Sequence, residues 1–345
     1  MIRRSIFIAL TLVLTAWCGH GYALGSLKSV GSVWKKTGYD CVVRSFAEDR
    51  AGRLWAGTFG AGLLVFDGSA WERIASVPEA IPDGRISKLV IDADGSLLAA
   101  TAGGGAFRFD VARRSSSPLI PGNEPGSRHF HAFIRTNDGR FLLGAVGEGV
   151  FLAEKGDWKH LTESDGLPSS WVNDAVPDGD GGIWLATWDG IARLDRAGSI
   201  DRVELPESPW TDGNVNVLAS CAGTLWIGTG SGGLIRRNPP ALPRKRPQYV
   251  RIPDVAPQVH ALQEHNGSLW VATEQGLFRV DPATGRAVPD CREAGDAAFT
   301  ALGVWKSALV AGTDMGAIWL RENDGRWSKI FEYRKDKPQT GGRSR

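Results

Sequence analysis

The sequence predicts an all-β protein, a closed seven-bladed β-propeller with four-stranded antiparallel blades. Three observations carry this prediction. A unit of about forty residues recurs seven times, and every unit divides into four short apolar runs separated by turns rich in Gly, Asp and Asn. The composition agrees, because 44 glycines and 14 tryptophans suit short strands joined by tight turns, and a hydrophobic fraction of 42% suffices for a core.

The repeat is visible by eye. GRLWAGTFGAGLLVFDG begins at Gly52 and returns in recognisable form as GSLWVATEQGLFRVD at Gly267. One large apolar anchor occupies the same place in each unit, at intervals of 39 to 44 residues: Trp55, Leu98, Leu142, Trp184, Trp226, Trp270 and Leu309. Seven copies at this period are typical of propeller blades. Because neighbouring blades pack face to face, we interpret the anchors as core residues that fill the space between them.

Each unit is expected to form four strands. The first is an apolar run such as 43–46 or 259–262, and the second carries the anchor and often ends in Gly-Thr or Ala-Thr. A glycine-rich turn leads to the third strand, and the fourth is least regular, with 71–74 as a clear example. The sequence does not decide how the ring closes, because residues 33–36 and 326–330 both resemble a fourth strand and only one of them can complete the seventh blade.

Residues 1–23 are expected to be a signal peptide. Arg3 and Arg4 precede an apolar run that ends at Trp17, and Gly21 and Ala23 are small residues where a signal peptidase cleaves. The run is too short for a comfortable membrane span, so we expect a periplasmic or secreted chain without a transmembrane segment once the signal is removed. An uncleaved anchor is the alternative. The propeller is then expected over 24–331, followed by a basic, flexible tail over 332–345.

The charge and the cysteines exclude several classes of protein. Forty basic and 38 acidic residues give a net charge of +2, and two of the basic residues lie in the signal, so no nucleic-acid partner is expected. Removal of Cys18 with the signal leaves Cys41, Cys221 and Cys291, which is no disulfide framework. Closure makes the loops of Cys41 and Cys291 neighbours, so these two thiols either form a bridge or stay buried and free.

The repeats resemble the two-component-regulator propeller repeats found in the periplasmic sensor halves of hybrid histidine kinases. The matching elements are the Asp/Asn-Gly-x-Leu/Ile-Trp step, the Gly-Thr or Ala-Thr after it, and the Gly-Leu before the third strand, over about residues 33–331. The resemblance implies the propeller fold and a sensor role, although these motifs are structural. Such sensors usually continue into a membrane helix and a kinase. We expect a stand-alone propeller here, a monomer that reports through another protein.

Binding residues are expected on one face of the ring, the funnel face, where the loops leading into the first strands and the loops between the second and third strands gather. The second residue of every first strand is polar: Arg44, Ser87, His131, Asn173, Asn216, His260 and Thr300. These side chains either hold a polar ligand or simply line a wet channel. The loops add further candidates for ligand binding, namely Arg85, Trp171, Trp188 and Glu274.

Three functions remain open. The leading hypothesis is a non-catalytic recognition module, which binds a small polar ligand such as a glycan, or an envelope protein, and feeds a two-component pathway. The second is a scaffold in an envelope complex, docked through the basic, proline-rich stretch 236–246. The third is a lyase that uses His260 with Glu274, since antibiotic-inactivating lyases with similar repeats are seven-bladed propellers. No phosphate loop, nucleophile elbow or metal-ligand motif is found, so no cofactor or metal is expected.

Overall fold

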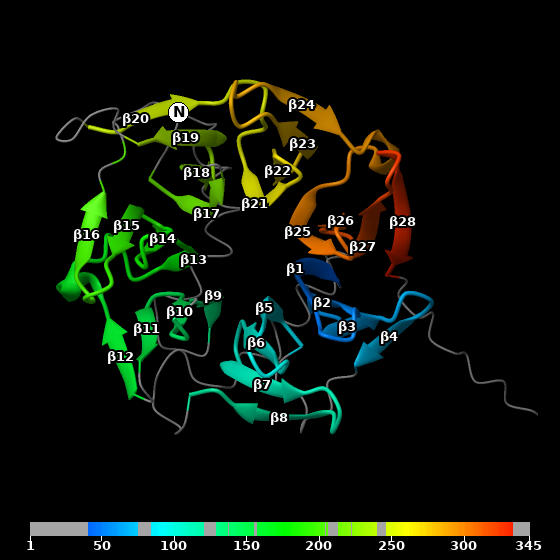
Figure 1. Ribbon diagram of the computed structural model, residues 1–345, viewed down its shortest axis with the longest axis horizontal. Helices are drawn as coiled ribbons and strands as arrows, with labels where there is room; N and C mark the ends of the chain where they lie inside the picture. The colour runs from blue at the N-terminus through cyan, green and yellow to red at the C-terminus, as the bar shows by residue number, and fades with distance from the viewer. Residues whose placement is uncertain are drawn as a thin grey trace, which may run out of the picture. The chain divides into compact units, whose positions relative to one another are not determined.

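The described part of the chain forms a ring of seven sheets (Figure 1). In the computed structural model, the described residues are 41–74, 84–120, 129–136, 138–154, 157–203, 205, 213–221, 223–239 and 246–333. Each sheet contains four consecutive strands in sequence order, all antiparallel. Two single-turn 3-10 helices, η1 (Glu163–Asp165) and η2 (Arg292–Ala294), lie in the connections. The predicted seven-bladed propeller is therefore confirmed.

The first strand of each blade lies nearest the central axis and is called the inner strand (Figure 1). The seven inner strands are β1 (Val42–Glu48), β5 (Ile86–Ile91), β9 (Phe130–Arg135), β13 (Val172–Pro177), β17 (Val215–Cys221), β21 (Val259–His265) and β25 (Phe299–Trp305). The second strands, which pair with them, are β2 (Leu54–Phe59), β6 (Leu97–Thr101), β10 (Phe141–Ala145), β14 (Ile183–Thr187), β18 (Thr224–Thr229), β22 (Ser268–Thr273) and β26 (Ala308–Thr313).

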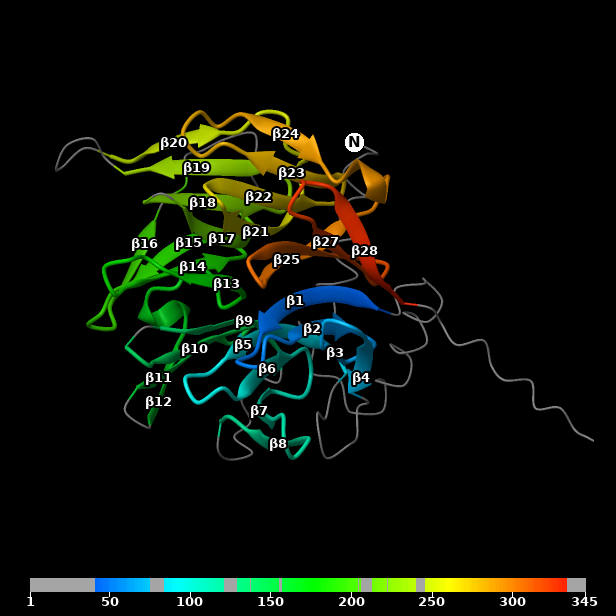
Figure 2. The same cartoon turned by 45° about the vertical axis from the view of Figure 1, so that its right-hand side comes forward.

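The third and fourth strands complete each blade toward the periphery (Figure 2). The third strands are β3 (Leu63–Phe66), β7 (Ala106–Asp110), β11 (Gly149–Glu154), β15 (Gly190–Leu194), β19 (Leu234–Asn238), β23 (Gly276–Val280) and β27 (Ala317–Arg321). The fourth strands are β4 (Trp71–Ile74), β8 (Ser115–Pro118), β12 (Asp157–Leu161), β16 (Ile200–Val203), β20 (Gln248–Arg251), β24 (Ala287–Asp290) and β28 (Trp327–Glu332).

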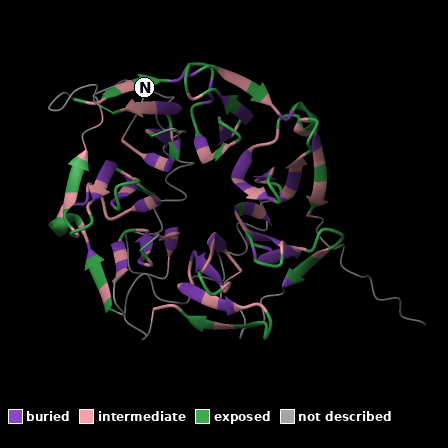
Figure 3. Ribbon diagram, in the orientation of Figure 1, coloured by how far each residue is buried: buried purple, intermediate pink, exposed green. Residues whose placement is uncertain are grey.

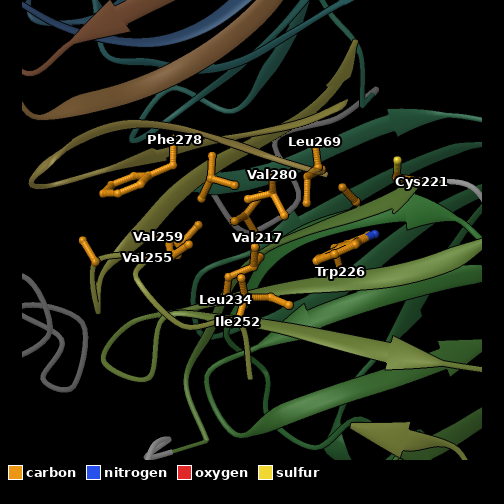
Figure 4. Packing of buried hydrophobic residues seen from close by; sticks show 13 residues of the cluster. Val217, Cys221, Trp226, Leu234, Ile252, Val255, Val259, Leu269, Phe278 and Val280 are labelled. Carbon is orange, nitrogen blue, oxygen red and sulfur yellow. The ribbon is translucent and has the colours of Figure 1, made fainter. Parts of the chain in front are cut away.

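The hydrophobic core lies between adjacent blades. Buried residues concentrate on the inner and second strands, whereas the outermost strands are largely exposed (Figure 3). Between blades 5 and 6, for example, Trp226 packs in one cluster with Val217, Val259 and Leu269 (Figure 4). Six of the seven predicted anchors are buried, with at most 2% of their surface exposed. Trp184 is half-buried, and the guanidinium of Arg237 lies over its ring, 4.8 Å from the centroid.

A small residue in every second strand allows neighbouring blades to approach closely. The residues at this position alternate between glycine and alanine along the sequence, so that blades 7 and 1, which meet at ring closure, both have glycine: Gly57, Ala100, Gly144, Ala186, Gly228, Ala272 and Gly312. A Cβ atom on Gly144 would lie 2.6 Å from Val172 Cγ1, and one on Gly228 would lie 2.6 Å from Val259 Cγ1. The first apolar residue of the next inner strand therefore needs the space that these glycines leave.

Ring closure is made by side chains between blades 1 and 7, and the C-terminal segment completes blade 7. β28 is the fourth strand of that blade, so of the two candidates the 326–330 segment takes this place, and residues 33–36 lie outside the described part. Trp71 Nε1 donates to the carbonyl of Ile330 (2.9 Å), and Trp305 Nε1 donates to that of Gly52 (2.8 Å). Thr300 Oγ1 adds a third bond between these blades.

Cys41, Cys221 and Cys291 are buried and no disulfide joins any two of them, so the Cys41–Cys291 bridge left open by the sequence is not formed. Cys291 packs in the cluster between blades 6 and 7, whereas Cys41 lies beside Gly316, in the turn between β26 and β27. Burial, together with the negative charges of Glu293 and Asp290, raises the pKa of the Cys291 thiol to about 12. Such a thiol is a packing residue with little reactivity.

Three expected segments lie wholly or largely outside the described residues, namely the signal peptide over 1–23, residues 240–245 of the basic, proline-rich stretch, and residues 334–345 of the tail. Among the helices that the structure describes, none has the length and apolar character needed to cross a membrane.

The close approach at ring closure predicts that Gly312→Ala destabilises the protein, because the new Cβ would overlap the side chain of Val43 in blade 1. Overpacking of this kind costs about 1–3 kcal/mol of unfolding free energy. The control is Gly84→Ala, where the nearest atom to a new Cβ is 3.8 Å away. Urea unfolding of both variants checks this, and equal stabilities would contradict the account of closure.

Candidate functional site

A β-bulge re-aims one side chain in every inner strand. The pairing of each inner strand with its second strand skips one residue, so that Val43 and Ser45, for example, pair with the consecutive residues Thr58 and Gly57. The skipped residues are the seven polar positions found in the sequence: Arg44, Ser87, His131, Asn173, Asn216, His260 and Thr300. A bulge re-aims a side chain, and the free edge of each inner strand borders the central axis (Figure 1). The seven positions therefore form one ring around the axis.

Four of the seven side chains join adjacent blades. Each donates to the carbonyl of the residue just before the bulge in the next blade: Ser87 to Phe130, Asn173 to Val215 (2.8 Å), Asn216 to Val259 (3.1 Å) and Thr300 to Val43 (2.6 Å). Net contributions of about 1 kcal/mol are typical of such bonds. Asn173 and Asn216, both predicted to bind ligand, thus have a structural task as well.

The other three form the channel triad, Arg44, His131 and His260, from blades 1, 3 and 6. Arg44 is exposed and the two histidines are half-buried, so solvent reaches all three side chains. Among the described residues, no hydrogen-bond or ion-pair partner is found for any of these three side chains. Three of the predicted site residues therefore lie on the same ring of bulge positions, and their polar atoms have no partner in the described part of the chain.

The electrostatics of the channel triad keep both imidazoles neutral at neutral pH. Desolvation, the positive charge of Arg44 and that of His129 lower the pKa of His131 to about 3. Desolvation and Arg44 lower the pKa of His260 to about 4. Desolvation also lowers the pKa of Arg44, but the side chain keeps contact with solvent and a guanidinium stays protonated. The channel thus holds one persistent positive charge beside two neutral rings.

Trp171 and Trp188 form an aromatic pair on the funnel face of blade 4. Their ring centroids are 5.3 Å apart at an interplanar angle of 65°, and both residues are half-buried. The backbone N–H of Trp188 donates to the carbonyl of Trp171 (3.0 Å), which fixes the two loops side by side. Thr187 Oγ1 donates to Gly190 (2.9 Å) and closes the turn that carries Trp188. The Ala-Thr step of the repeat thereby positions a loop of the candidate site.

The remaining predicted residues, Arg85 and Glu274, lie at separate places around the face. Arg85 sits over the ring of Phe59, 5.9 Å from its centroid, between blades 1 and 2. Burial raises the pKa of Glu274 in blade 6, and its Oε2 atom is buried without a partner among the described residues. No hydrogen bond joins Glu274 to His260. Within the described ranges, no three His, Cys, Asp or Glu side chains cluster as metal ligands.

Sequence reasoning missed an ion pair that spans the ring. Lys88 Nζ of blade 2 lies 3.3 Å from Asp174 Oδ1 of blade 4, and Asp174 Oδ2 also accepts from the N–H of Leu218 (3.1 Å). Both charges occupy the third position of an inner strand, where the other blades have a small or apolar residue. Charged residues at a position that is otherwise small or apolar could have indicated this pair from the sequence. The pair matters because the negative charge of Asp174 is balanced by the positive charge of Lys88.

A second hollow of about 750 Å³ lies between blades 5 and 6, on residues that include Cys221, Arg236 and Glu264. Arg236 Nη1 donates to the carbonyls of Pro282 (3.1 Å) and Ala283 (3.3 Å). Its cation is therefore engaged in joining two blades, and the hollow is a weaker candidate than the channel.

The family model of the two component regulator propeller matches residues 40–60 and 166–189. These segments contain β1 and β2 of blade 1 and β13 and β14 of blade 4. Two segments of this seven-bladed propeller, one in blade 1 and one in blade 4, thus match the two component regulator propeller repeat that the sequence resembles. A comparison with curated proteins finds no match.

Solved structures share the fold. An extracellular domain from B. thetaiotaomicron, described as part of a one component system, matches with a TM-score of 0.67 and 21% identity over 86% of this chain and 42% of that one. Another extracellular domain from B. thetaiotaomicron, described as part of a hybrid two component system, matches with a TM-score of 0.67 and 19% identity. That match covers 83% of this chain and 39% of the other. This chain therefore spans about two fifths of their length. A virginiamycin B lyase from Staphylococcus aureus matches with a TM-score of 0.64 and 13% identity, over 81% of this chain and 94% of the lyase. At these identities the likeness establishes the fold alone.

The lowered histidine pKa values predict that stability falls as the solution becomes acidic. Between about pH 4 and 6.5 the unfolded chain protonates His260 while the folded protein does not, so each such histidine removes about 1.4 kcal/mol of unfolding free energy per pH unit. Urea unfolding at several pH values across this window gives the unfolding free energy as a function of pH, and this free energy should fall less steeply with acidification in His260→Gln. The matched control is His265→Gln, at the other end of β21, which should keep the original slope. Identical slopes in all three proteins would contradict the prediction.

Proposed function

We propose that this chain is a non-catalytic, exported recognition module that binds a small polar ligand at the funnel face and reports its presence to another protein. The observation that carries the proposal is the channel triad. Its three side chains, Arg44, His131 and His260, occupy bulge positions around one axis and keep contact with solvent. The charge of Arg44 acts on both histidines. Polar side chains that make no bonds within the protein, and so do not stabilise the fold, are typical of binding sites.

The surroundings of the channel triad support a ligand larger than a water molecule or an ion alone. The loops above the inner strands carry the half-buried pair Trp171 and Trp188, whose partly open rings suit the apolar face of a sugar or a peptide side chain. Rigid turns hold these loops, as the bond from Thr187 to Gly190 illustrates. A preorganised face of this kind binds without a large entropy of ordering.

The sensor role within this proposal draws on the two component regulator propeller repeats and on the extracellular sensor-type domains that share the fold. In such a role the propeller is exported, meets its ligand outside the cytoplasm and passes the signal on by contact with a partner. The lyase alternative has weaker support. Its two candidate groups, His260 and Glu274, form no hydrogen bond, and a general acid–base pair works within hydrogen-bond reach of one substrate.

A thermal-shift screen of the purified protein tests the proposal with envelope glycans, peptidoglycan fragments, sulfated polysaccharides and peptides. A ligand at a hundredfold its dissociation constant should stabilise the fold by about 2.7 kcal/mol. We expect the shift to disappear in Arg44→Ala and His260→Ala and to persist in Arg279→Gln, an exposed position on β23. A shift that survives both channel variants would place the ligand elsewhere. No shift with any class would favour a protein-docking scaffold instead.

A further inference from the structure

The channel triad contains a positive charge that the protein does not neutralise. Some arginines within the blades are paired with carboxylates, as Arg193 is with Asp178 and Arg108 with Asp92 (2.6 Å). Others donate to backbone carbonyls, as Arg236 does to Pro282. Arg44 has no such partner among the described residues. The carboxylate on the inner ring, Asp174, is occupied by Lys88 and by the N–H of Leu218. A cation without a counter-charge in a channel lined by protein raises the local potential and attracts an anion.

All the charged and titratable groups at the funnel end of the inner strands contribute to this potential. On the inner strands and in the residue just before each of them, these groups are Arg44 on β1, Arg85 and Lys88 in blade 2, His129 and His131 in blade 3, Asp174 on β13 and His260 on β21. β17 and β25 place only the neutral Asn216 and Thr300 there, and both donate to a neighbouring blade. Lys88 and Asp174 compensate each other, and Arg44 is then the cation of the channel triad for which no counter-charge is found among the described residues.

Resting on the proposed function, we propose that the group bound at the channel triad is an anion, a carboxylate, sulfate or phosphate, and that its binding draws protons from solvent onto His131 and His260. A guanidinium recognises these oxyanions with its planar set of N–H donors. Two imidazoles on other sides of the axis supply further donors. A neutral ligand would leave Arg44 uncompensated, and a cationic ligand would be repelled by it.

The proton uptake follows from the same charges. In the free protein, desolvation and Arg44 hold the pKa values of both histidines far below their ordinary range. A bound anion offsets the charge of Arg44 and stabilises an imidazolium, so those pKa values rise when the site is filled. Protons are then taken up between about pH 5 and pH 7, and linkage requires the affinity to increase as the pH falls, by up to tenfold per pH unit for each proton.

Calorimetric titration tests this with sodium sulfate, inorganic phosphate and glucuronate, and with glucose as the neutral counterpart of glucuronate, all at one ionic strength. Sulfate and glucuronate keep their charge between about pH 5.5 and about pH 7, so any pH dependence of their binding comes from the protein. Comparing the three anions shows whether the site prefers a sulfate, a phosphate or a carboxylate. We expect tighter binding at the lower pH, and heats that differ between buffers of unlike ionisation enthalpy because protons are taken up. Glucose should bind more weakly than glucuronate.

The variants decide between explanations. Arg44→Gln should weaken anion binding at least about tenfold. Arg44→Lys keeps a positive charge and should retain part of the binding, which guards against a folding defect. Arg279→Gln makes the same change of charge outside the channel and should leave the affinity unchanged. Anion binding unaltered in Arg44→Gln, or heats identical in both buffers, would overturn the inference. If only a neutral glycan binds, and His260→Ala abolishes its binding, the proposed function stands and the inference fails.

Discussion

The β-bulge at the second residue of each inner strand is the constraint on which the architecture and the candidate site both depend. It takes one residue per blade out of the sheet register and brings seven side chains around a common axis. Four of them each join one blade to the next, at four of the seven junctions. The other three, Arg44, His131 and His260, have no such task. One repeated local irregularity thus supplies both the bonds that hold the ring together and the polar groups that it presents.

Close packing of the blades complements these bonds. Glycine or alanine in each second strand admits the first apolar residue of the next inner strand, and the Trp and Leu anchors fill the wider space behind it. The same contacts close the ring between blades 1 and 7, where tryptophan N–H groups bond to backbone carbonyls across the junction. Closure therefore depends on side-chain fit between two complete blades, with no strand exchanged between the chain ends in the described residues.

The fold could be predicted from the sequence because its determinants are local and repeated. Anchor spacing, turn residues and the polar second position are each visible in one unit and verified in six others. The site could not be predicted to the same depth. Nothing local distinguishes Asn173, which bonds to the next blade, from His260, which does not, because the difference lies in how each side chain reaches across a blade boundary. Lys88 and Asp174, 86 positions apart in sequence, meet only because the ring brings blades 2 and 4 together.

In the central channel, the charge of Arg44 acts on two imidazoles from other blades. The most direct measurement is the NMR titration of the ring nitrogens of His131 and His260, in the unaltered protein and in Arg44→Gln. The account predicts pKa values near 3 and 4 in the former, both moving up toward the ordinary range in the variant. Two histidines that titrate near 6.5 in both proteins would show that the three side chains do not share one channel, and would contradict the account.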